Sequence, residues 1–136
     1  MQSTTHRKYC IPLVFSTVSA GFPSPAQDYI EDSIDISQKL IRNPSSTFLV
    51  RAHGDSMKDS NIQNGDILVV DKALEVKNND VVIAYIDGEF TVKRFFKSKN
   101  HITLYPANDN YKPIHIKSST DFLIWGVVTY VLHKYR

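Results

Sequence analysis

A succession of short β-rich runs constrains the fold of this chain more than any other feature. From residue 47 onward, stretches rich in Val, Ile, Thr, Tyr and Phe alternate with gaps that contain Gly, Pro, Asn or Asp. β-Branched and aromatic residues pack well on a pleated sheet, and the residues of the gaps favour turns. We therefore predict a compact, mostly β domain of short strands and hairpins, with strands at residues 47–52, 67–71, 81–86, 89–96, 102–105 and 122–132.

One of these gaps is only two residues long. Asp87-Gly88 connects the runs at 81–86 and 89–96. An Asp-Gly pair favours a tight hairpin because both residues tolerate a positive φ. The sequence therefore predicts a β-hairpin over residues 81–96.

The beginning of the chain has a different character. Residues 1–25 are rich in Ser, Thr, Gly and Pro, which is typical of extended, exposed chain. We predict a flexible N-terminal arm at residues 1–25 and a β-rich domain at residues 26–136. Within residues 26–41, acidic residues precede Lys39, an order that suits a helix dipole and predicts one short helix, although residues 33–37 alternate as a strand would.

The composition is that of a globular protein, with 42% hydrophobic residues, 22% charged residues and a formal net charge of +2. This weak charge lies far below the basic balance of a dedicated nucleic-acid binder.

No apolar stretch approaches the ~18 residues needed to span a bilayer, so we expect no membrane association and a cytoplasmic location. Cys10 is the only cysteine, which rules out an internal disulfide.

Motifs for nucleotide and metal chemistry are missing from the sequence. It contains no GxGxxG, no GxxxxGKS/T and no HExxH pattern, and no second cysteine for a CxxC site. The five histidines do not stand at i, i+4 spacing, and we interpret them as ordinary surface or core residues: His6, His53, His101, His115 and His133. We expect neither a cofactor nor a bound metal.

The run Gly54-Asp55-Ser56-Met57 is the first candidate for chemistry. It follows an apolar run directly. A serine on a glycine-initiated turn at a strand end exposes its hydroxyl and leaves neighbouring backbone N–H groups free to hold an oxyanion. An ordinary turn with no catalytic role is the alternative interpretation.

Lys93 is the second candidate. Strand alternation places it on the same face as Thr91 and Phe95, and an apolar environment there would favour the neutral amine. The alternative is a lysine whose stem covers the core while its head reaches water. A lysine of ordinary pKa, about 10.4, is protonated at pH 7, so it can act as a base only if it is buried.

Together, the two candidates resemble the Ser-Lys dyad of the LexA/UmuD family of self-cleaving serine peptidases, in which a Gly-x-Ser-Met turn carries the nucleophile and a strand lysine follows it. The resemblance extends over most of the chain and includes, in order, AGFPSPA at residues 20–26, GDILVVD at 65–71, DGEFTVK at 87–93 and WGVV at 125–128. The first of these segments looks like the cleavage region of the UmuD branch.

This resemblance implies a role for each motif. Ser56 would be the nucleophile, Lys93 the general base, the backbone of Asp55 and Ser56 the oxyanion donors, and Ala20-Gly21 the bond that is cut. It also implies a function in the SOS response to DNA damage. A RecA filament on DNA would stimulate self-cleavage, and the shortened chain would form a homodimer and serve a UmuC-like Y-family polymerase in translesion DNA synthesis.

Only about 20 residues precede the proposed cleavage site, too few for the helix-turn-helix domain with which a repressor reads DNA. Sequence-specific DNA binding is therefore not expected. Two other functions stay open: a β-rich interaction module that never cleaves, and a signal-peptidase-like Ser-Lys protease that acts on other proteins. The second would need a membrane anchor, for which the sequence offers no apolar span.

Overall fold

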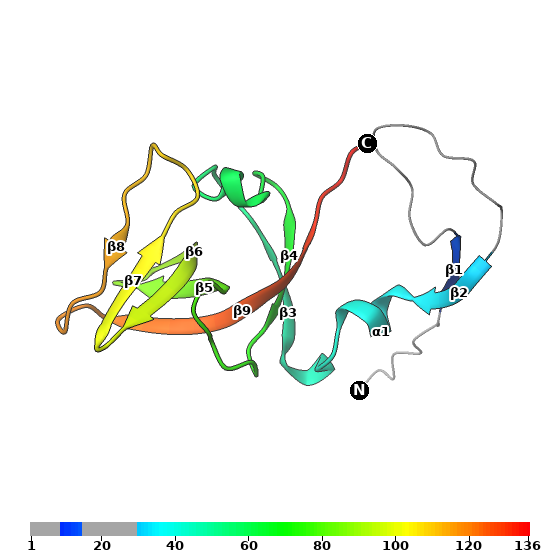
Figure 1. The fold of residues 1–136 in the computed structure, drawn as a ribbon, viewed down its shortest axis with the longest axis horizontal. Coiled ribbons are helices and arrows are strands. Elements are labelled where there is room, and N and C mark those ends of the chain that lie inside the picture. Colours follow the sequence, from blue (N-terminus) through cyan, green and yellow to red (C-terminus); the bar gives the residue numbers. More distant parts are fainter. Residues whose placement is uncertain (1–8, 15–29) are drawn as a thin grey trace. The chain divides into compact units, whose positions relative to one another are not determined.

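The computed structural model describes residues 9–14 and 30–136. It divides into two compact units, Met1–Arg42 and Asn43–Arg136, which we describe separately (Figure 1). The predicted arm boundary near residue 25 lies outside the described residues, and the division into an arm and a peptidase domain stays a prediction.

The described part of the first unit is a small antiparallel ribbon followed by one helical turn. Strand β1 (Cys10–Val14) pairs with strand β2 (Ile30–Asp35), and helix α1 (Ile36–Leu40) follows directly. Asp35 begins the helix, because its carboxylate accepts hydrogen bonds from the backbone N–H groups of Ser37 and Gln38.

The one short helix predicted within residues 26–41 is present as α1. Among the described residues of this segment, Ile30–Asp35 form a strand and Ile36–Leu40 form the helix. The alternating pattern noted at residues 33–37 agrees with the strand as far as Asp35. Pairing with β1 supplies the backbone hydrogen bonds that a longer helix would otherwise have made.

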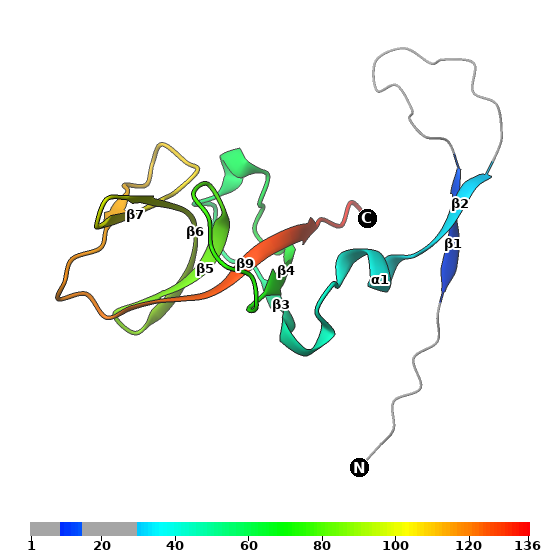
Figure 2. The ribbon, with the colours of Figure 1, turned by 60° about the horizontal axis from the view of Figure 1, so that its bottom comes forward.

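The second unit is a seven-stranded antiparallel sheet in the order β3-β4-β9-β5-β6-β7-β8 (Figures 1 and 2). Two short 3₁₀ turns, Pro44–Ser46 and Lys58–Ser60, lie before and after β3. The mostly β fold predicted from the sequence is confirmed. The strands are β3 (Thr47–Arg51), β4 (Ile67–Asp71), β5 (Val81–Ile86), β6 (Glu89–Ser98), β7 (His101–Tyr105), β8 (Ile114–His115) and β9 (Phe122–Leu132).

Strand β9 joins the two halves of this sheet. It pairs with β4 along one part of its length and with β5 along the other. The register shifts in both pairings, so that Trp125 and Thr129 are the extra residues of two bulges. Bulges bend a strand and increase its twist, which lets one long strand follow both partners around the sheet (Figure 2).

Strand β5 lies between two hydrophobic clusters. Val82 and Ala84 belong to one cluster with Phe95 and Leu104, while Ile83 belongs to the other with Leu68. Successive side chains of a strand point to opposite faces, and all three central residues of β5 are buried. The strand that pairs with the candidate lysine strand is therefore packed on both faces.

The predicted hairpin over residues 81–96 is confirmed. Ile86 pairs with Glu89, which leaves Asp87 and Gly88 as the two-residue connection. Both have positive φ, 47° and 95°, as a type I′ hairpin turn requires. The turn fixes the register of β6 on β5 and hence the face from which each side chain of β6 projects.

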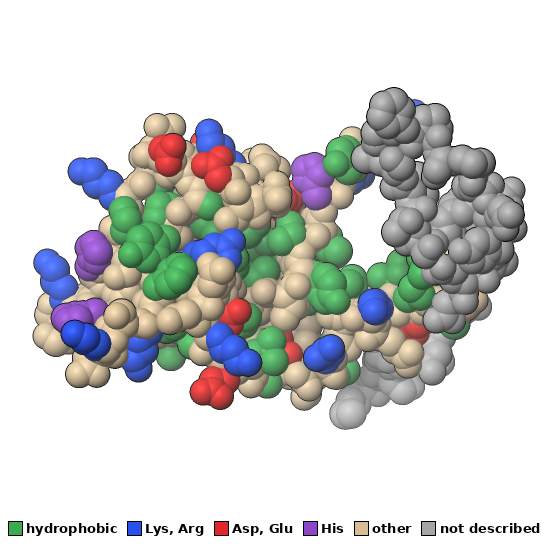
Figure 3. All heavy atoms as spheres, viewed as in Figure 1, with side chains coloured by type: hydrophobic (Ala, Val, Ile, Leu, Met, Phe, Trp, Pro, Cys, Tyr) green, Lys and Arg blue, Asp and Glu red, His purple; other side chains and the backbone are tan. Residues whose placement is uncertain are grey.

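Charged and apolar side chains are unevenly placed on the visible surface of the second unit. Lys, Arg and His gather at the end formed by β6, β7 and β8, beside a hydrophobic area (Figure 3). The sequence contains no acidic residue between Glu89 and Asp109.

In the part of the chain that the structure describes, no helix is long and apolar enough to cross a membrane, and no group of His, Cys, Asp or Glu is arranged to hold a metal ion.

Candidate active site

Ser56 lies in the loop between β3 and β4, on a turn that packs against the hydrophobic core. Gly54 has a φ of +87°, which permits the sharp change of direction after the strand. Its N–H donates a hydrogen bond of 2.8 Å to Asn64 Oδ1. Met57, next to the serine, is only 3% exposed and packs in the core with Ile62. The serine is therefore presented at the edge of a rigid turn.

Asp66 fixes the closing end of this turn. Its backbone carbonyl accepts a hydrogen bond from Ala52 N–H at 2.8 Å, and its carboxylate accepts from Gln63 N–H at 2.8 Å and lies 2.5 Å from His133 Nδ1. Burial raises the pKa of Asp66, but the hydrogen bonds from Gln63 and His133 and the charge of His133 outweigh it, so the pKa is lowered overall. The backbone carbonyl of Asp66 therefore joins the two ends of the turn, and its ionised carboxylate holds the closing end in place.

Lys93 lies in β6 and is almost fully buried, with 6% of its surface exposed. It pairs in register with Val82 of β5, and alternation places it on the face of Thr91 and Phe95, as predicted. Its Nζ lies 3.1 Å from Ser56 Oγ, 2.6 Å from Thr91 Oγ1 and 3.0 Å from the carbonyl oxygen of Val92. The structure thus brings the two candidate residues within hydrogen-bond distance.

Burial lowers the pKa of Lys93, because removal from water disfavours the charged ammonium. No carboxylate forms an ion pair with it among the described residues, so nothing in that part of the chain offsets this cost with an opposite charge. An amine in this position is more easily converted to its neutral form than an exposed lysine. The neutral form is the one that can accept a proton from a serine hydroxyl.

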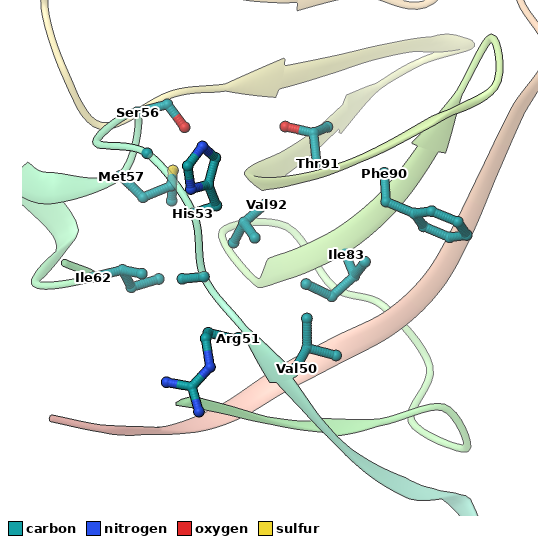
Figure 4. Close-up of a pocket in the computed structure, with 12 residues that line it drawn as sticks. Val50, Arg51, His53, Ser56, Met57, Ile62, Ile83, Phe90, Thr91 and Val92 are labelled. Carbon is teal, nitrogen blue, oxygen red and sulfur yellow. The ribbon is translucent and has the colours of Figure 1, made fainter. Parts of the chain in front are cut away.

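A pocket of about 260 Å³ opens beside Ser56, and twelve residues line it: Val50, Arg51, Ala52, His53, Gly54, Ser56, Met57, Ile62, Ile83, Phe90, Thr91 and Val92. Its walls come from β3 and the serine turn on one side and from β5 and β6 on the other (Figure 4). The serine and Thr91 lie at the same end of this pocket. His53 also lines it but makes no hydrogen bond to Ser56 in the described structure, whereas Lys93 does.

The predicted oxyanion donors lie beside the serine hydroxyl. Within the described part of the chain, the backbone N–H groups of Asp55 and Ser56 have no hydrogen-bond acceptor. Both groups are therefore available to a ligand, as an oxyanion site requires. The carbonyl groups of the same residues are occupied, because they accept hydrogen bonds from Asn108 and from the backbone of Ala107.

Two further residues near the site are not predictable from a sequence motif. Asn108 Nδ2 donates a 2.9 Å hydrogen bond to the carbonyl of Asp55, and the Tyr111 hydroxyl donates a 2.7 Å hydrogen bond to the Asp55 carboxylate. The only signal in the sequence was a polar segment, Asn108-Asp109-Asn110-Tyr111, between two predicted strands, and loops often carry functional groups. The predicted cleavage pair, Ala20 and Gly21, lies outside the described residues.

Comparison with known proteins identifies the family of the chain. The chain matches the Peptidase S24-like family over residues 12–129. Protein SamA of Salmonella typhimurium is 47% identical over 125 residues, which cover 92% of this chain and 86% of SamA. Protein ImpA of Shigella flexneri is 43% identical over 130 residues, covering 94% and 87% of the two chains. Protein MucA of Escherichia coli is 39% identical over 131 residues, covering 96% and 89%. The family predicted from the motifs is confirmed: the chain belongs to the Peptidase S24-like family and is a serine peptidase of the UmuD-like type.

Proposed function

We propose that this protein cuts its own N-terminal arm between Ala20 and Gly21, with Ser56 as nucleophile and Lys93 as general base. The observation that carries the proposal is the 3.1 Å separation of Lys93 Nζ and Ser56 Oγ, with the lysine 6% exposed. A buried amine in hydrogen-bond contact with a serine hydroxyl has the geometry and the lowered pKa that proton transfer needs.

The reaction begins with neutral Lys93. Its Nζ takes the proton of the Ser56 hydroxyl while Oγ forms a bond to the carbonyl carbon of Ala20. The resulting oxyanion accepts hydrogen bonds from the backbone N–H groups of Asp55 and Ser56. When the C–N bond breaks, the amine of Gly21 takes the proton from Lys93 and leaves, and Ser56 is left as an ester of Ala20.

A water molecule completes the reaction. Lys93, neutral again, takes a proton from this water, and the hydroxide attacks the ester carbonyl. The ester bond breaks, Ser56 recovers its proton, and the arm leaves with Ala20 as its terminal carboxylate. Small residues at the cleavage site suit a shallow pocket, since Ala20 has a single methyl group and Gly21 has no side chain to obstruct approach.

Membership in the UmuD-like group supports a role in SOS mutagenesis, as an accessory subunit that acts after DNA damage. We further propose that a RecA filament on DNA stimulates the cut. The processed chain would then form a homodimer and assist a UmuC-like Y-family polymerase. Since enzyme and substrate share one chain, such a stimulus need only change how often the arm occupies the site.

The experiment that tests the cut uses the full-length chain. The purified protein is incubated at about pH 9 to 10, where a lysine base is more often neutral, and the products are weighed by mass spectrometry. A fragment that begins at Gly21, absent from the Ser56→Ala variant, supports the proposal. An intact chain after prolonged incubation, both alone and with RecA on single-stranded DNA, favours the alternative of an interaction module. Cleavage of an added protein but not of the chain itself favours the signal-peptidase-like alternative.

A further inference from the structure

The loop between β7 and β8 is bonded to the serine turn by its backbone. Ala107 N–H donates a 2.7 Å hydrogen bond to the carbonyl of Ser56, and the carbonyl of Ala107 accepts one of 2.8 Å from Asp59 N–H. These two bonds hold the loop against the serine and against the residue three positions after it. The turn therefore depends for its shape on a segment some fifty residues further along the sequence.

Asn108 is a buried side chain through which the loop contacts the turn. It is only 5% exposed. Its Nδ2 donates to the carbonyl of Asp55 at 2.9 Å, and its Oδ1 accepts from Asn110 N–H at 3.0 Å. Both ends of the amide are thus engaged, and a buried amide with both ends bonded has one orientation only.

The bond to the Asp55 carbonyl also determines where the Ser56 N–H points. The two groups belong to the same peptide unit, which is planar and trans, so the carbonyl and the N–H point in opposite directions. Asn108 and Lys58 N–H both donate to this carbonyl, at 2.9 and 3.2 Å. The N–H of Ser56 is thereby directed away from the loop, and it has no acceptor in the described part of the chain.

Tyr111 holds the side chain of Asp55 in place. Its hydroxyl donates a 2.7 Å hydrogen bond to Asp55 Oδ1. This hydrogen bond, the charge of Asp55 and partial burial raise the pKa of Tyr111. The hydroxyl therefore keeps its proton, and the hydrogen bond persists, to a higher pH than for a free tyrosine.

We infer that Asn108, assisted by Tyr111, is a positioning residue that orients the backbone N–H of Ser56 toward the oxyanion of the cleavage reaction. The inference rests on the proposed self-cleavage and adds to it a residue that never contacts the reacting atoms. An oxyanion donor is effective only when it is already aimed at the charge that develops. Without the Asn108 amide, the peptide between Asp55 and Ser56 can rotate, and the Ser56 N–H no longer points toward the oxyanion.

The test compares Asn108→Ala with Asn110→Ala in the full chain. Asn110 is exposed and lies in the same loop, and only its backbone N–H takes part in the network. First-order self-cleavage rates are measured across the pH range. We expect Asn108→Ala to lower the plateau rate by about ten- to a hundred-fold, as for a misplaced oxyanion donor. The pH midpoint should stay unchanged, because Lys93 keeps its surroundings. Asn110→Ala should match the wild type in both.

A second variant covers the case in which Asn108→Ala does not fold. Asn108→Asp keeps the shape and the acceptor for Asn110 N–H but removes the Nδ2 donor. Its plateau rate should fall similarly, and Asn110→Asp is the control for the added charge. Tyr111→Phe should lower the plateau rate only a few-fold, since it frees the Asp55 side chain but not the peptide. Circular dichroism at the assay temperature verifies that each variant is folded.

The amide resonance of Ser56 gives a readout that does not need cleavage. In the ¹⁵N-labelled full chain, Asn108→Ala should move this resonance and Asn110→Ala should not. A folded Asn108→Ala variant that cleaves at the wild-type plateau rate overturns the inference, as does one whose loss of rate comes from a shifted pH midpoint. If the wild type itself fails to cleave while the Ser56 resonance moves as expected, the proposed function fails and the orienting contact stands.

Discussion

The Nζ of Lys93 lies nearer to the hydroxyl of Thr91, at 2.6 Å, than to the hydroxyl of Ser56, at 3.1 Å. Thr91 precedes the lysine by two residues on the same strand, so alternation places both side chains on one face of β6. The threonine hydroxyl therefore fixes the lysine amine in front of the serine. It also gives the charged form of that amine a hydrogen-bond acceptor in a buried site.

Thr91→Val should change the cleavage reaction in two ways. Without the hydroxyl, the ammonium form of Lys93 loses an acceptor, so the pH midpoint of self-cleavage should move to a lower value. The amine is also held less firmly, and the plateau rate should fall about tenfold. Thr103→Val, the same substitution on β7, is the control and should leave both parameters unchanged. A midpoint that moves upward would contradict this account of Thr91.

The pH dependence of the wild type follows from the lowered pKa of Lys93. Below that pKa the amine is protonated and cannot act as a base, so the rate should rise about tenfold for each pH unit and level off above it. First-order rates between about pH 6 and 11 measure the midpoint. A rate that falls steadily over this range would argue against a lysine base.

The lowered pKa of Lys93 should also make the stability of the fold depend on pH. Between the lowered pKa and the ordinary lysine value of about 10.4, the unfolded chain binds more protons than the folded one. The contribution of Lys93 to the free energy of unfolding therefore increases as the pH rises through this window. Urea unfolding of the wild type, with Lys93→Met as the control that lacks the titrating group, measures this difference. Equal slopes against pH for the two proteins would contradict it.

Ser56→Ala and Lys93→Ala should each abolish self-cleavage while the sheet remains folded. Ser56→Ala removes the oxygen that attacks, and Lys93→Ala removes the group that takes its proton. Mass spectrometry after prolonged alkaline incubation should find only the full-length chain, and thermal melting followed by circular dichroism should retain a cooperative transition. A fragment that starts at Gly21 in either variant would show that the assignment of the two residues is wrong.

Gly21→Lys should prevent processing at the predicted bond. A long charged side chain beside the scissile carbonyl would obstruct the approach of Ser56, whereas Gly21→Ala adds only a methyl group and should still be cut, although more slowly. Both variants leave the second unit untouched, so their unfolding curves should match the wild type. Normal processing of Gly21→Lys would place the cleavage site elsewhere in the arm.

Gly126→Ala should destabilise the fold of the protein. A Cβ at this position would lie 2.5 Å from Val70 Cγ1, and Val70 is completely buried. Such an overpacked contact typically costs about 1–3 kcal/mol of unfolding free energy. Urea unfolding measures the loss, and the double variant Gly126→Ala/Val70→Ala should be less destabilised than the sum of its single variants. Additive effects would mean that the two side chains do not clash.

Much of the sheet could be predicted because its signals are local. The bounds of β4, β5 and β9 agree with the predicted runs, since alternation and turn residues act over a few neighbouring positions. The hairpin at Asp87-Gly88 could also be predicted from its turn residues, and it determines which face of β6 carries Lys93. By contrast, the strand at residues 30–35 was not predicted, because it forms by pairing with a strand some twenty residues earlier in the chain.

The sequence by itself determined six strands of the seven-stranded sheet, the hairpin register and the identity of the two candidate residues, because periodicity, turn chemistry and motif are properties of neighbouring residues. Only the tertiary structure decided that Lys93 is buried and lies against Ser56, since the two are 37 residues apart. It also decided the contacts of Asn108 and Tyr111 with Asp55, across 53 and 56 residues. A hydrogen bond depends on distance and direction in space, and these are set only when β6, β7 and the serine turn are packed together.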